Sequence, residues 1–319
     1  ASFALVSYRT AYLKAHYPAE FMAAVLSNRG GFYDTCGYVE EARRMGLAIL
    51  PPHVNASVEA FTAERRPGAG GAGARTGHAI RIGLSQVKGL TRHAIRSILE
   101  ARQQRGPYRT LDDFLDRVIL DGRDAESLIR CGALDGLGAS RPNLLWALKR
   151  RVAARRRRPG SRGTAGFLPP ACEVPRLPEY EAREKRLAEL ECLDLTVDAH
   201  LISLYDLNRD DLLPARDLDQ HAGRVVTLAG WLVHSKRTRT VKNEFMKFLM
   251  LEDATAPFEV TLFPKVYRRF GPLLVDRGPY LVKGRVEREG DCITLTALWL
   301  GRVGEGPVFL RSGVAPPGK

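Results

Sequence analysis

The feature that most constrains the fold is a series of five short apolar segments with strand-like alternation in the last third of the chain. One short helical segment, Val266–Phe270, lies between the third and the fourth of them. Five strands with one helix at that point is the order of an OB-fold β-barrel. We therefore predict such a barrel over residues 223–303, followed by a tail over 304–319. The five segments are Val225–Val233, Phe245–Leu251, Phe258–Phe263, Tyr280–Val286 and Cys292–Leu298.

The first predicted domain is residues 1–82, of which residues 1 to about 61 read as helical with a short extended exit. Asp34 is suited to cap one of the helices, because its short side chain can accept a hydrogen bond from a free backbone N–H group. Leu47–Leu50 reads as a short strand stopped by two prolines. We expect Phe61–Ala63 and Ala79–Ile82 to pair as a hairpin across a glycine-rich tip.

Residues 83–158 are predicted to form a tandem helix-hairpin-helix domain. Its first copy is the turn Gly83–Leu90, followed by a helical run that begins at Thr91. A tight turn at Gly89 lets backbone N–H groups and the next helix N-terminus face a phosphate, which positions DNA without reading its bases. The predicted DNA-binding residues of this copy are Lys88, Gly89, Leu90 and Arg92.

A second, weaker copy lies at Leu128–Gly138. We expect it to be mainly structural, since Asp135 stands where it would repel a phosphate. Two helices joined by ordinary glycine turns is the alternative for each copy taken alone.

The charge of the chain favours a polyanionic partner. Lysine and arginine number 49 against 36 acidic residues, a formal net charge of +13. Arg155 and Arg156, in the basic run Lys149–Arg158, are candidate contacts to the DNA backbone. A solvated helix end and an arginine-rich composition from a GC-rich genome are the alternatives. The residues that follow, 159–222, read as a linker and a connecting helix.

The barrel has a second basic cluster in the connection between its first two strands. A cationic loop beside aromatic rings is the combination by which OB-folds bind single-stranded nucleic acid. The rings themselves are expected to fill the barrel core rather than to bind a ligand, and the alternative of a ligand contact stays open for Phe245. These rings are Trp231, Phe245, Phe248 and Phe258. The candidate DNA-binding cations are Lys236, Arg237, Arg239 and Lys242.

No metal or catalytic site is predicted. Asp217-Leu218-Asp219 reads as surface charge and Glu252-Asp253 as the end of a strand, so neither makes a persuasive two-metal carboxylate cluster. The five scattered cysteines form no zinc or disulfide pattern, and no apolar run approaches the length of a bilayer span. We expect a cytoplasmic protein with free thiols and no membrane contact.

The chain also resembles one family in several blocks. Ser2–Met22 closely resembles the end of the fingers domain of bacterial C-family DNA polymerases, the DNA polymerase III alpha subunits and their error-prone relatives. Leu50–Ser57 and Ile82–Leu90 are similar to later blocks of that family, and Leu128–Leu137 to the end of its hairpin domain. The barrel motifs Met246-Lys247-Phe248, Leu251-Glu252-Asp253, Phe263–Tyr267 and Tyr280–Val286 resemble its OB domain.

The resemblance implies a multidomain α and β architecture: a fingers remnant, the tandem hairpin domain, a linker and the OB-fold. It further implies DNA-directed DNA synthesis by the full polymerase with magnesium and deoxynucleotides, on duplex and single-stranded DNA. The catalytic palm of the family precedes the matched region, so we expect this fragment to hold no cofactor and to be inactive alone. The sliding clamp and other replisome or mutasome subunits are implied partners, although the linker peptide Phe167-Leu168 lacks the usual glutamine. A stand-alone, non-catalytic DNA-binding or scaffold protein is the alternative.

Overall fold

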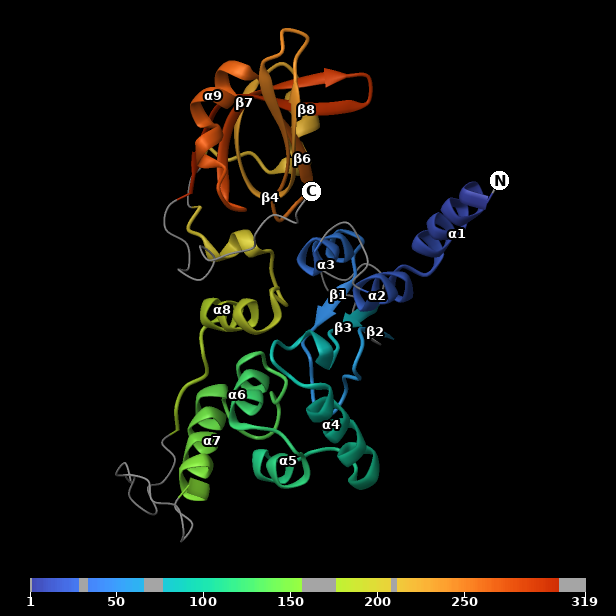
Figure 1. The fold of residues 1–319 in the computed structure, drawn as a ribbon, viewed down its shortest axis with the longest axis vertical. Coiled ribbons are helices and arrows are strands. Elements are labelled where there is room, and N and C mark those ends of the chain that lie inside the picture. Colours follow the sequence, from blue (N-terminus) through green and yellow to red (C-terminus); the bar gives the residue numbers. More distant parts are fainter. Residues whose placement is uncertain (1, 29–33, 66–76, 157–175, 208–210, 304–319) are drawn as a thin grey trace. The chain divides into compact units, whose positions relative to one another are not determined.

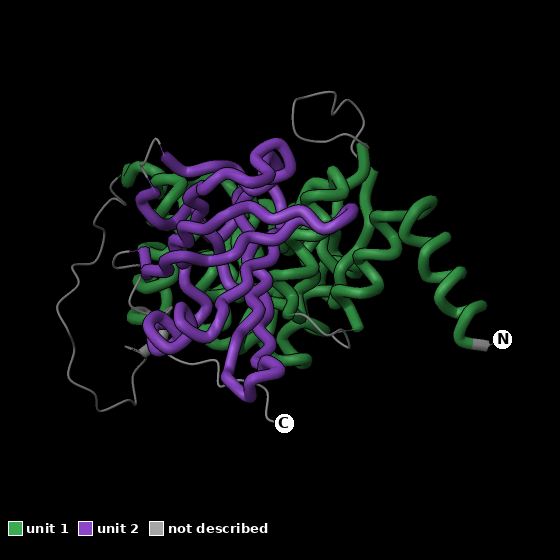
Figure 2. Tube along the Cα trace, turned by 90° about the horizontal axis from the view of Figure 1, so that it is seen from above, with its two compact units in different colours: residues 1–198 green, residues 199–319 purple. Residues whose placement is uncertain are grey.

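The computed structural model describes residues 2–28, 34–65, 77–156, 176–207 and 211–303 (Figure 1). The chain divides into two compact units, residues 1–198 and 199–319, which Figure 2 shows in different colours. This division lies inside the segment 159–222 that was predicted as linker and connecting helix. The domain boundaries proposed from the sequence at residues 82, 158, 222 and 303 remain predictions.

The first unit begins with three helices, α1 (Ser2–His16), α2 (Pro18–Asn28) and α3 (Thr35–Arg44). Asp34 caps α3 as predicted, because its side chain accepts a hydrogen bond from the Gly37 backbone N–H at 2.8 Å. The described side chains of α1 are all exposed, and Lys14 on that helix pairs with Glu41 of α3 at 2.9 Å.

A small sheet follows these helices. It consists of β1 (Ala48–Leu50), β2 (Thr62–Arg65) and β3 (His78–Arg81) in the order β1-β3-β2. β2 and β3 pair antiparallel, which confirms the predicted hairpin. β1 pairs parallel with β3, a contact that the sequence analysis did not predict.

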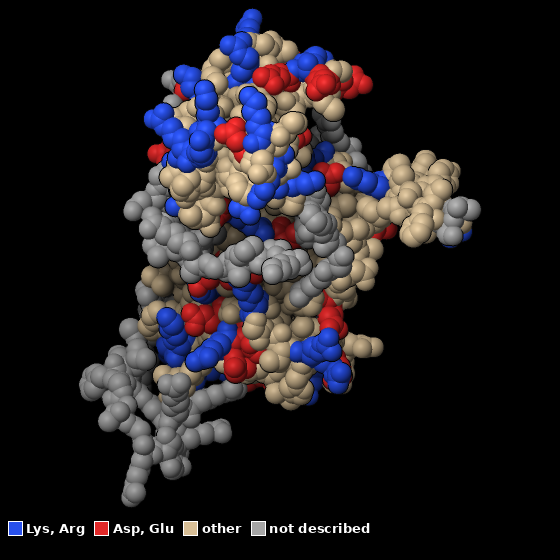
Figure 3. Space-filling model, turned by 45° about the horizontal axis from the view of Figure 1, so that its top comes forward, with Lys and Arg blue, Asp and Glu red and all other residues tan. Residues whose placement is uncertain are grey.

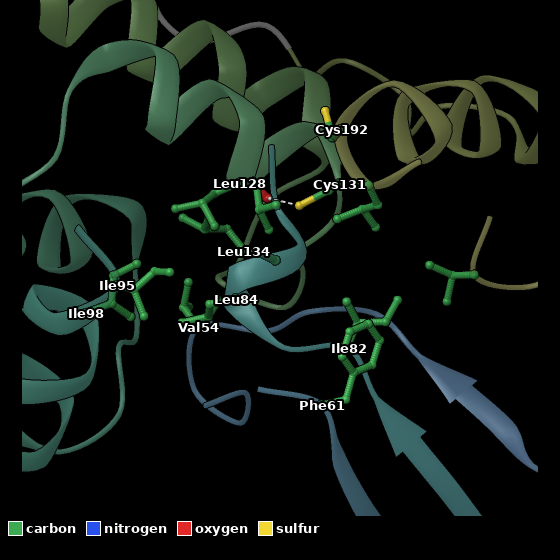
Figure 4. Packing of buried hydrophobic residues seen from close by; sticks show 14 of the residues in the cluster. Val54, Phe61, Ile82, Leu84, Ile95, Ile98, Leu128, Cys131, Leu134 and Cys192 are labelled. Atoms are coloured by element: carbon green, nitrogen blue, oxygen red, sulfur yellow. Dashed lines mark hydrogen bonds between the residues drawn. The ribbon is translucent and has the colours of Figure 1, made fainter. Parts of the chain in front are cut away.

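The rest of the first unit is helical. Its core runs without interruption from the sheet into these helices. Figure 4 shows Ile82 beside Phe61, Leu84 close to Val54 and Leu134, and Ile95 beside Ile98. The elements are η1 (Leu84–Gln86), α4 (Arg92–Arg105), α5 (Leu111–Arg117), α6 (Gly122–Arg130), α7 (Arg141–Arg156) and α8 (Ala182–Leu193).

The loop after β1 joins the parts of this unit through side-chain hydrogen bonds. Ser57 Oγ accepts from the His53 N–H at 2.9 Å and donates to the Ile82 carbonyl at 2.8 Å. Asn55 makes two bonds to the backbone of Tyr108, of 2.8 Å and 2.7 Å. Such bonds satisfy polar groups that would otherwise be buried unpaired. The family block Leu50–Ser57 therefore holds the sheet and the helices together.

The second unit is a closed barrel with the strand order β4-β5-β6-β8-β7. α9 lies between the third and fourth strands of the sequence, so the OB-fold prediction is confirmed. Alternate residues of the strands fill the interior, among them Leu249, Val260 and Tyr280. The elements are η2 (Leu201–Leu204), η3 (Ala215–His221), β4 (Val225–Arg239), β5 (Phe245–Glu252), β6 (Pro257–Leu262), α9 (Pro264–Phe270), η4 (Gly271–Leu273), β7 (Tyr280–Glu289) and β8 (Cys292–Arg302).

The first barrel strand is longer than the sequence analysis predicted. It was expected to end at Val233, with the four cations in a loop, but β4 continues to Arg239 and pairs with β5 up to Phe245. Lys236, Arg237 and Arg239 therefore lie in the strand. The prediction was wrong because alternating polar residues at the far end of a two-stranded hairpin carry no apolar signal.

None of the helices within the described ranges is long and apolar enough to cross a membrane. Four cysteines fall in these ranges and all are free thiols. Cys36, Cys131 and Cys192 are buried and Cys292 is exposed.

Candidate nucleic-acid interface

The first hairpin presents its turn to solvent. Lys88 and Gly89 are exposed, and Gly89 has φ +81°, a conformation that disfavours any side chain. A Cβ atom built on Gly89 would find no heavy atom of the described residues within 4 Å. The turn is therefore open to solvent on the side where a side chain of residue 89 would point.

The turn leads directly into the N-terminus of α4. Thr91 caps this helix, since its hydroxyl accepts a hydrogen bond from the Ala94 N–H at 3.1 Å. Within the described residues, the backbone N–H groups of Gly89, Thr91 and Arg92 have no hydrogen-bond partner. Free N–H groups at a helix N-terminus form a ready anion site.

The structure brings together three of the four predicted residues of this hairpin. Lys88, Gly89 and Arg92 are exposed around the turn. Leu90 differs, because its half-buried side chain packs against the core of the first unit. Leu90 thus anchors the turn, and any contact it makes to DNA comes from its backbone.

The end of α8 also holds this hairpin, which the sequence analysis did not foresee. The Lys88 backbone N–H donates to the Cys192 carbonyl at 2.8 Å. The amide of Gln86, a buried side chain, donates to the Leu193 carbonyl at 2.7 Å. Both acceptors are carbonyls at a helix C-terminus, which have no hydrogen-bond partner within the helix itself. No local pattern links residues about a hundred positions apart.

The turn of the second hairpin is held by hydrogen bonds to other parts of the first unit. Asp135 accepts hydrogen bonds from the buried guanidinium of Arg141 at 2.9 Å and 2.7 Å, and Arg141 also donates to the Arg130 carbonyl at 3.1 Å. The Ala133 carbonyl of the same turn accepts from the Val54 N–H at 2.9 Å. The turn is thus occupied by bonds within the protein, in agreement with the mainly structural role expected for this copy.

The basic run at the end of α7 is partly engaged in ion pairs. Arg151 contacts Asp112, at 2.6 Å, and Asp116 of α5. The guanidinium of Arg150 lies 5.1 Å from the centre of the Trp146 ring. Arg155 and Arg156 are in the last turn of α7, and their side chains lie outside the described part of the structure.

The outer part of the β4–β5 hairpin of the barrel carries a cluster of cations around one ring. Arg237 and Arg239 each place their guanidinium carbon 4.7 Å from the centre of the Phe245 ring. Phe245 is 41% exposed. Lys247 pairs across the strands with Arg237, and residues paired in this way share a face of the sheet. We call Arg237, Arg239, Phe245 and Lys247 the barrel cluster.

The electrostatics of the barrel cluster favour an anion. Burial lowers the pKa of Lys247, and the charge of Arg237 lowers it further. A neighbouring phosphate would relieve this repulsion. Glu244, the nearest acidic residue along the hairpin, pairs with Arg268 at 3.4 Å. Figure 3 shows lysine and arginine side chains gathered on the visible face of the barrel.

Sequence reasoning placed the four barrel cations together, but the structure separates them. Lys236 pairs with Phe248 and belongs to the opposite face of the hairpin from Arg237 and Arg239. Lys242 is exposed in the short turn 240–244. Lys247 was missed as a cation of this surface, although its position two residues after Phe245 is the signal that could have found it.

Of the four rings expected in the core, only Phe258 belongs to the barrel core cluster, and it is 4% exposed. Trp231 is 7% exposed but lies outside that cluster, with its ring centre 6.2 Å from that of Tyr205. Phe248 is half-buried on the opposite face of the hairpin from Phe245. The expectation was also wrong for Phe245, which is 41% exposed. A ring that is exposed beside two guanidinium groups is typical of a stacking site for a base.

The acidic pairs considered from the sequence have structural partners. Asp253 accepts from the backbone N–H groups of Ala215 and Thr255, each at 2.7 Å, as in a turn. Asp219 pairs with Arg288. Across the described residues there is no group of three or more histidine, cysteine, aspartate or glutamate side chains that could hold a metal ion.

Comparison with known proteins identifies relatives of this chain. The family model described as a helix-hairpin-helix motif matches residues 46–144. The error-prone DNA polymerase of Symbiobacterium thermophilum is 35% identical over 93% of this chain and 31% of that protein. The DNA polymerase III subunit alpha of Thermus aquaticus is 34% identical over 98% of this chain and 26% of that protein. The error-prone DNA polymerase of Mycobacterium tuberculosis is 30% identical over 95% of this chain and 26% of that protein.

The chain spans between about a quarter and a third of the length of these curated relatives. The match covers nearly all of the chain and agrees with the hairpin motif and the barrel, so the predicted resemblance is confirmed. The chain is a homologue of one segment of the bacterial C-family DNA polymerases, the DNA polymerase III alpha subunits and the error-prone DNA polymerases.

Proposed function

We propose that this chain is the DNA-holding part of a bacterial DNA polymerase. The observation that carries the proposal is the open turn at Gly89, with free N–H groups at the start of α4, inside the region that matches the helix-hairpin-helix motif. Backbone donors of this kind grip a phosphate whatever the base sequence, as a polymerase requires.

The barrel cluster is proposed to bind single-stranded template. Phe245 offers a ring on which a base can stack, and Arg237, Arg239 and Lys247 offer positive charge to the neighbouring phosphates. Duplex and single strand would then contact different units of the chain.

The full polymerase is proposed to catalyse DNA-directed DNA synthesis with magnesium, in replication or in error-prone repair synthesis. Its metal-binding palm would lie outside these 319 residues, and the chain alone would be inactive. The sliding clamp and other replisome or mutasome subunits are further proposed partners. The peptide Phe167-Leu168, on which clamp binding would depend, lies outside the described residues.

A salt titration of duplex and single-strand binding tests the proposal. Alanine at the three cations of the barrel cluster should weaken single-strand affinity and flatten its salt slope by about two units, at roughly 0.7 per phosphate neutralised. Duplex affinity should change less. The replaced residues are Arg237, Arg239 and Lys247.

A control variant removes three exposed cations from other parts of the second unit, so that the change in net charge is the same. It should leave the single-strand slope close to that of the unmodified chain. If both variants lower the slope equally, binding depends on net charge alone and the barrel cluster is not a site. The control residues are Arg216, Arg224 and Lys283.

The alternative is a stand-alone DNA-binding or scaffold protein without a polymerase. The coding sequence upstream of Ala1 decides between the two. A reading frame that continues into a palm with its aspartates supports the polymerase, and a stop codon directly upstream supports the scaffold.

A further inference from the structure

The last turn of α8 places two carboxylates against cations of the two hairpins. Lys88 Nζ of the first hairpin lies 2.6 Å from Asp194 Oδ1. Arg130, at the start of the second hairpin turn, donates to Glu191 through both terminal nitrogens, with Nη1 3.1 Å from Oε1. Asp194 is the residue that ends the helix. One element therefore supplies an acidic partner to each copy of the motif.

This arrangement is unusual for a helix end. The C-terminus of a helix carries partial negative charge, so cations are favoured there and carboxylates are not. The hairpin cations offset that cost. The hydrogen bond from Arg130 lowers the pKa of Glu191, and the charges of Arg130 and Lys88 contribute in the same direction.

The position of Asp194 relative to Lys88 is set by the backbone. The Lys88 N–H and the Gln86 amide bind the carbonyls of Cys192 and Leu193, the two residues just before Asp194. The Asp194 N–H in turn donates to the Leu190 carbonyl at 3.0 Å. The backbone of Asp194 is left-handed, with φ +58°. The carboxylate is thus held beside the Gly89 turn, where a phosphate would have to approach.

We propose that Asp194 is an internal competitor of the DNA backbone that limits the affinity of the first hairpin for duplex. The inference rests on the proposed function, because it assumes that Lys88 and Gly89 meet a phosphate. In this proposal a phosphate that binds Lys88 takes the place of the Asp194 carboxylate. The freed carboxylate then attracts a cation from solution, which cancels part of the counterion release that drives binding. A polymerase that moves along its template gains from a grip that is weak at each phosphate.

Neutralising Asp194 tests the inference. Asp194→Asn keeps a residue that tolerates positive φ and removes only the charge. Duplex affinity should rise about two- to fivefold at low salt, the range expected for one exposed ion pair. The salt slope should become steeper by about 0.9, because one counterion release is no longer cancelled.

The matched control is Asp198→Asn. Asp198 pairs with Arg186 of the same helix, at 2.8 Å and 2.9 Å, and the variant makes the same change in net charge away from the hairpin turn. Lys88→Ala provides a second readout. It should weaken duplex binding more in the Asp194→Asn background than in the unmodified chain, since Lys88 is free of its acidic partner only there.

The outcomes separate the two proposals. If the unmodified chain shows no salt-dependent duplex binding, the proposed function fails. If it binds duplex, but Asp194→Asn matches Asp198→Asn in affinity and slope, the competitor role alone is refuted. A loss of affinity in a folded Asp194→Asn chain also refutes it, because Asp194 would then orient Lys88 toward DNA.

Discussion

The two hairpin glycines Gly89 and Gly132 allow the same substitution to be compared in an open turn and in a packed one. Both have positive φ, +81° and +83°. An alanine at either position therefore suffers backbone strain of about 1–2 kcal/mol. At Gly89 the new methyl group meets nothing within 4 Å, and at Gly132 it overlaps the guanidinium of Arg141 and lies 2.9 Å from Asp135 Oδ2.

The difference in cost follows from that overlap. Arg141 is 3% exposed, so Gly132→Ala must move a buried cation away from its carboxylate partner. Breaking a fully buried pair costs about 3–5 kcal/mol. The Asp135 side chain is 38% exposed and can be hydrated in part, so we expect about 2–3 kcal/mol in addition to the strain. Gly132→Ala should thus lower the free energy of unfolding by about 3–5 kcal/mol, and Gly89→Ala by about 1–2 kcal/mol.

Urea denaturation followed by circular dichroism measures both values, and fluorescence anisotropy with a labelled duplex measures binding under conditions where each variant is folded. Gly89→Ala should bind duplex more weakly than the unmodified chain, because its methyl group occupies the open side of the turn. Gly132→Ala should bind almost normally when folded. Equal losses of stability at the two positions would refute the packing argument, and normal duplex binding by Gly89→Ala would refute the phosphate site.

Three further outcomes are expected. Gly89→Val should weaken duplex binding more than Lys88→Ala in the same anisotropy assay, since it blocks the turn while the lysine is already paired with Asp194; the reverse order would reduce the motif to an ordinary turn. The isolated chain should extend no primer with magnesium and four deoxynucleotides, and robust extension by a sample free of host polymerase would contradict this. Lys247→Met should stabilise the barrel near neutral pH and weaken single-strand binding. The pKa of Lys247 is lowered on folding, so the unmodified barrel gains stability as pH rises through that folded pKa. Urea titrations at several pH values should show that the free energy of unfolding depends less on pH in the Met variant than in the unmodified chain. An unchanged pH dependence would show that folding does not lower the pKa of Lys247.

Much of the fold could be predicted because its signals are local. Asp34 needs only the three following residues to act as a cap, and the barrel strands alternate in their own sequence. The limits of β4 could not be predicted in the same way. Its outer half is a two-stranded hairpin with polar residues on both faces, so only its hydrogen bonds to β5 define it as strand.

The sequence predicted which types of residue form the candidate site, and the structure corrected which of them lie on the same surface. The sequence indicated Lys88 and Gly89 from one compact motif, and their exposure agrees with that reading. It also proposed Lys236 beside Arg237, but the two-residue period of a strand sends neighbours to opposite faces. Lys247 joins the barrel cluster instead, because strand pairing brings it to the face of Arg237.

The sequence by itself determined the order of the elements, the barrel topology and the relationship to DNA polymerases. Periodicity, helix caps and family motifs are all properties of contiguous residues. Only the tertiary structure decided which charges are free. Asp135 is satisfied by Arg141, and Lys88 is paired with Asp194 across more than a hundred residues. How far a charged group is available to a ligand depends on the groups that pack beside it. Packing between distant segments is established only when the whole unit has folded.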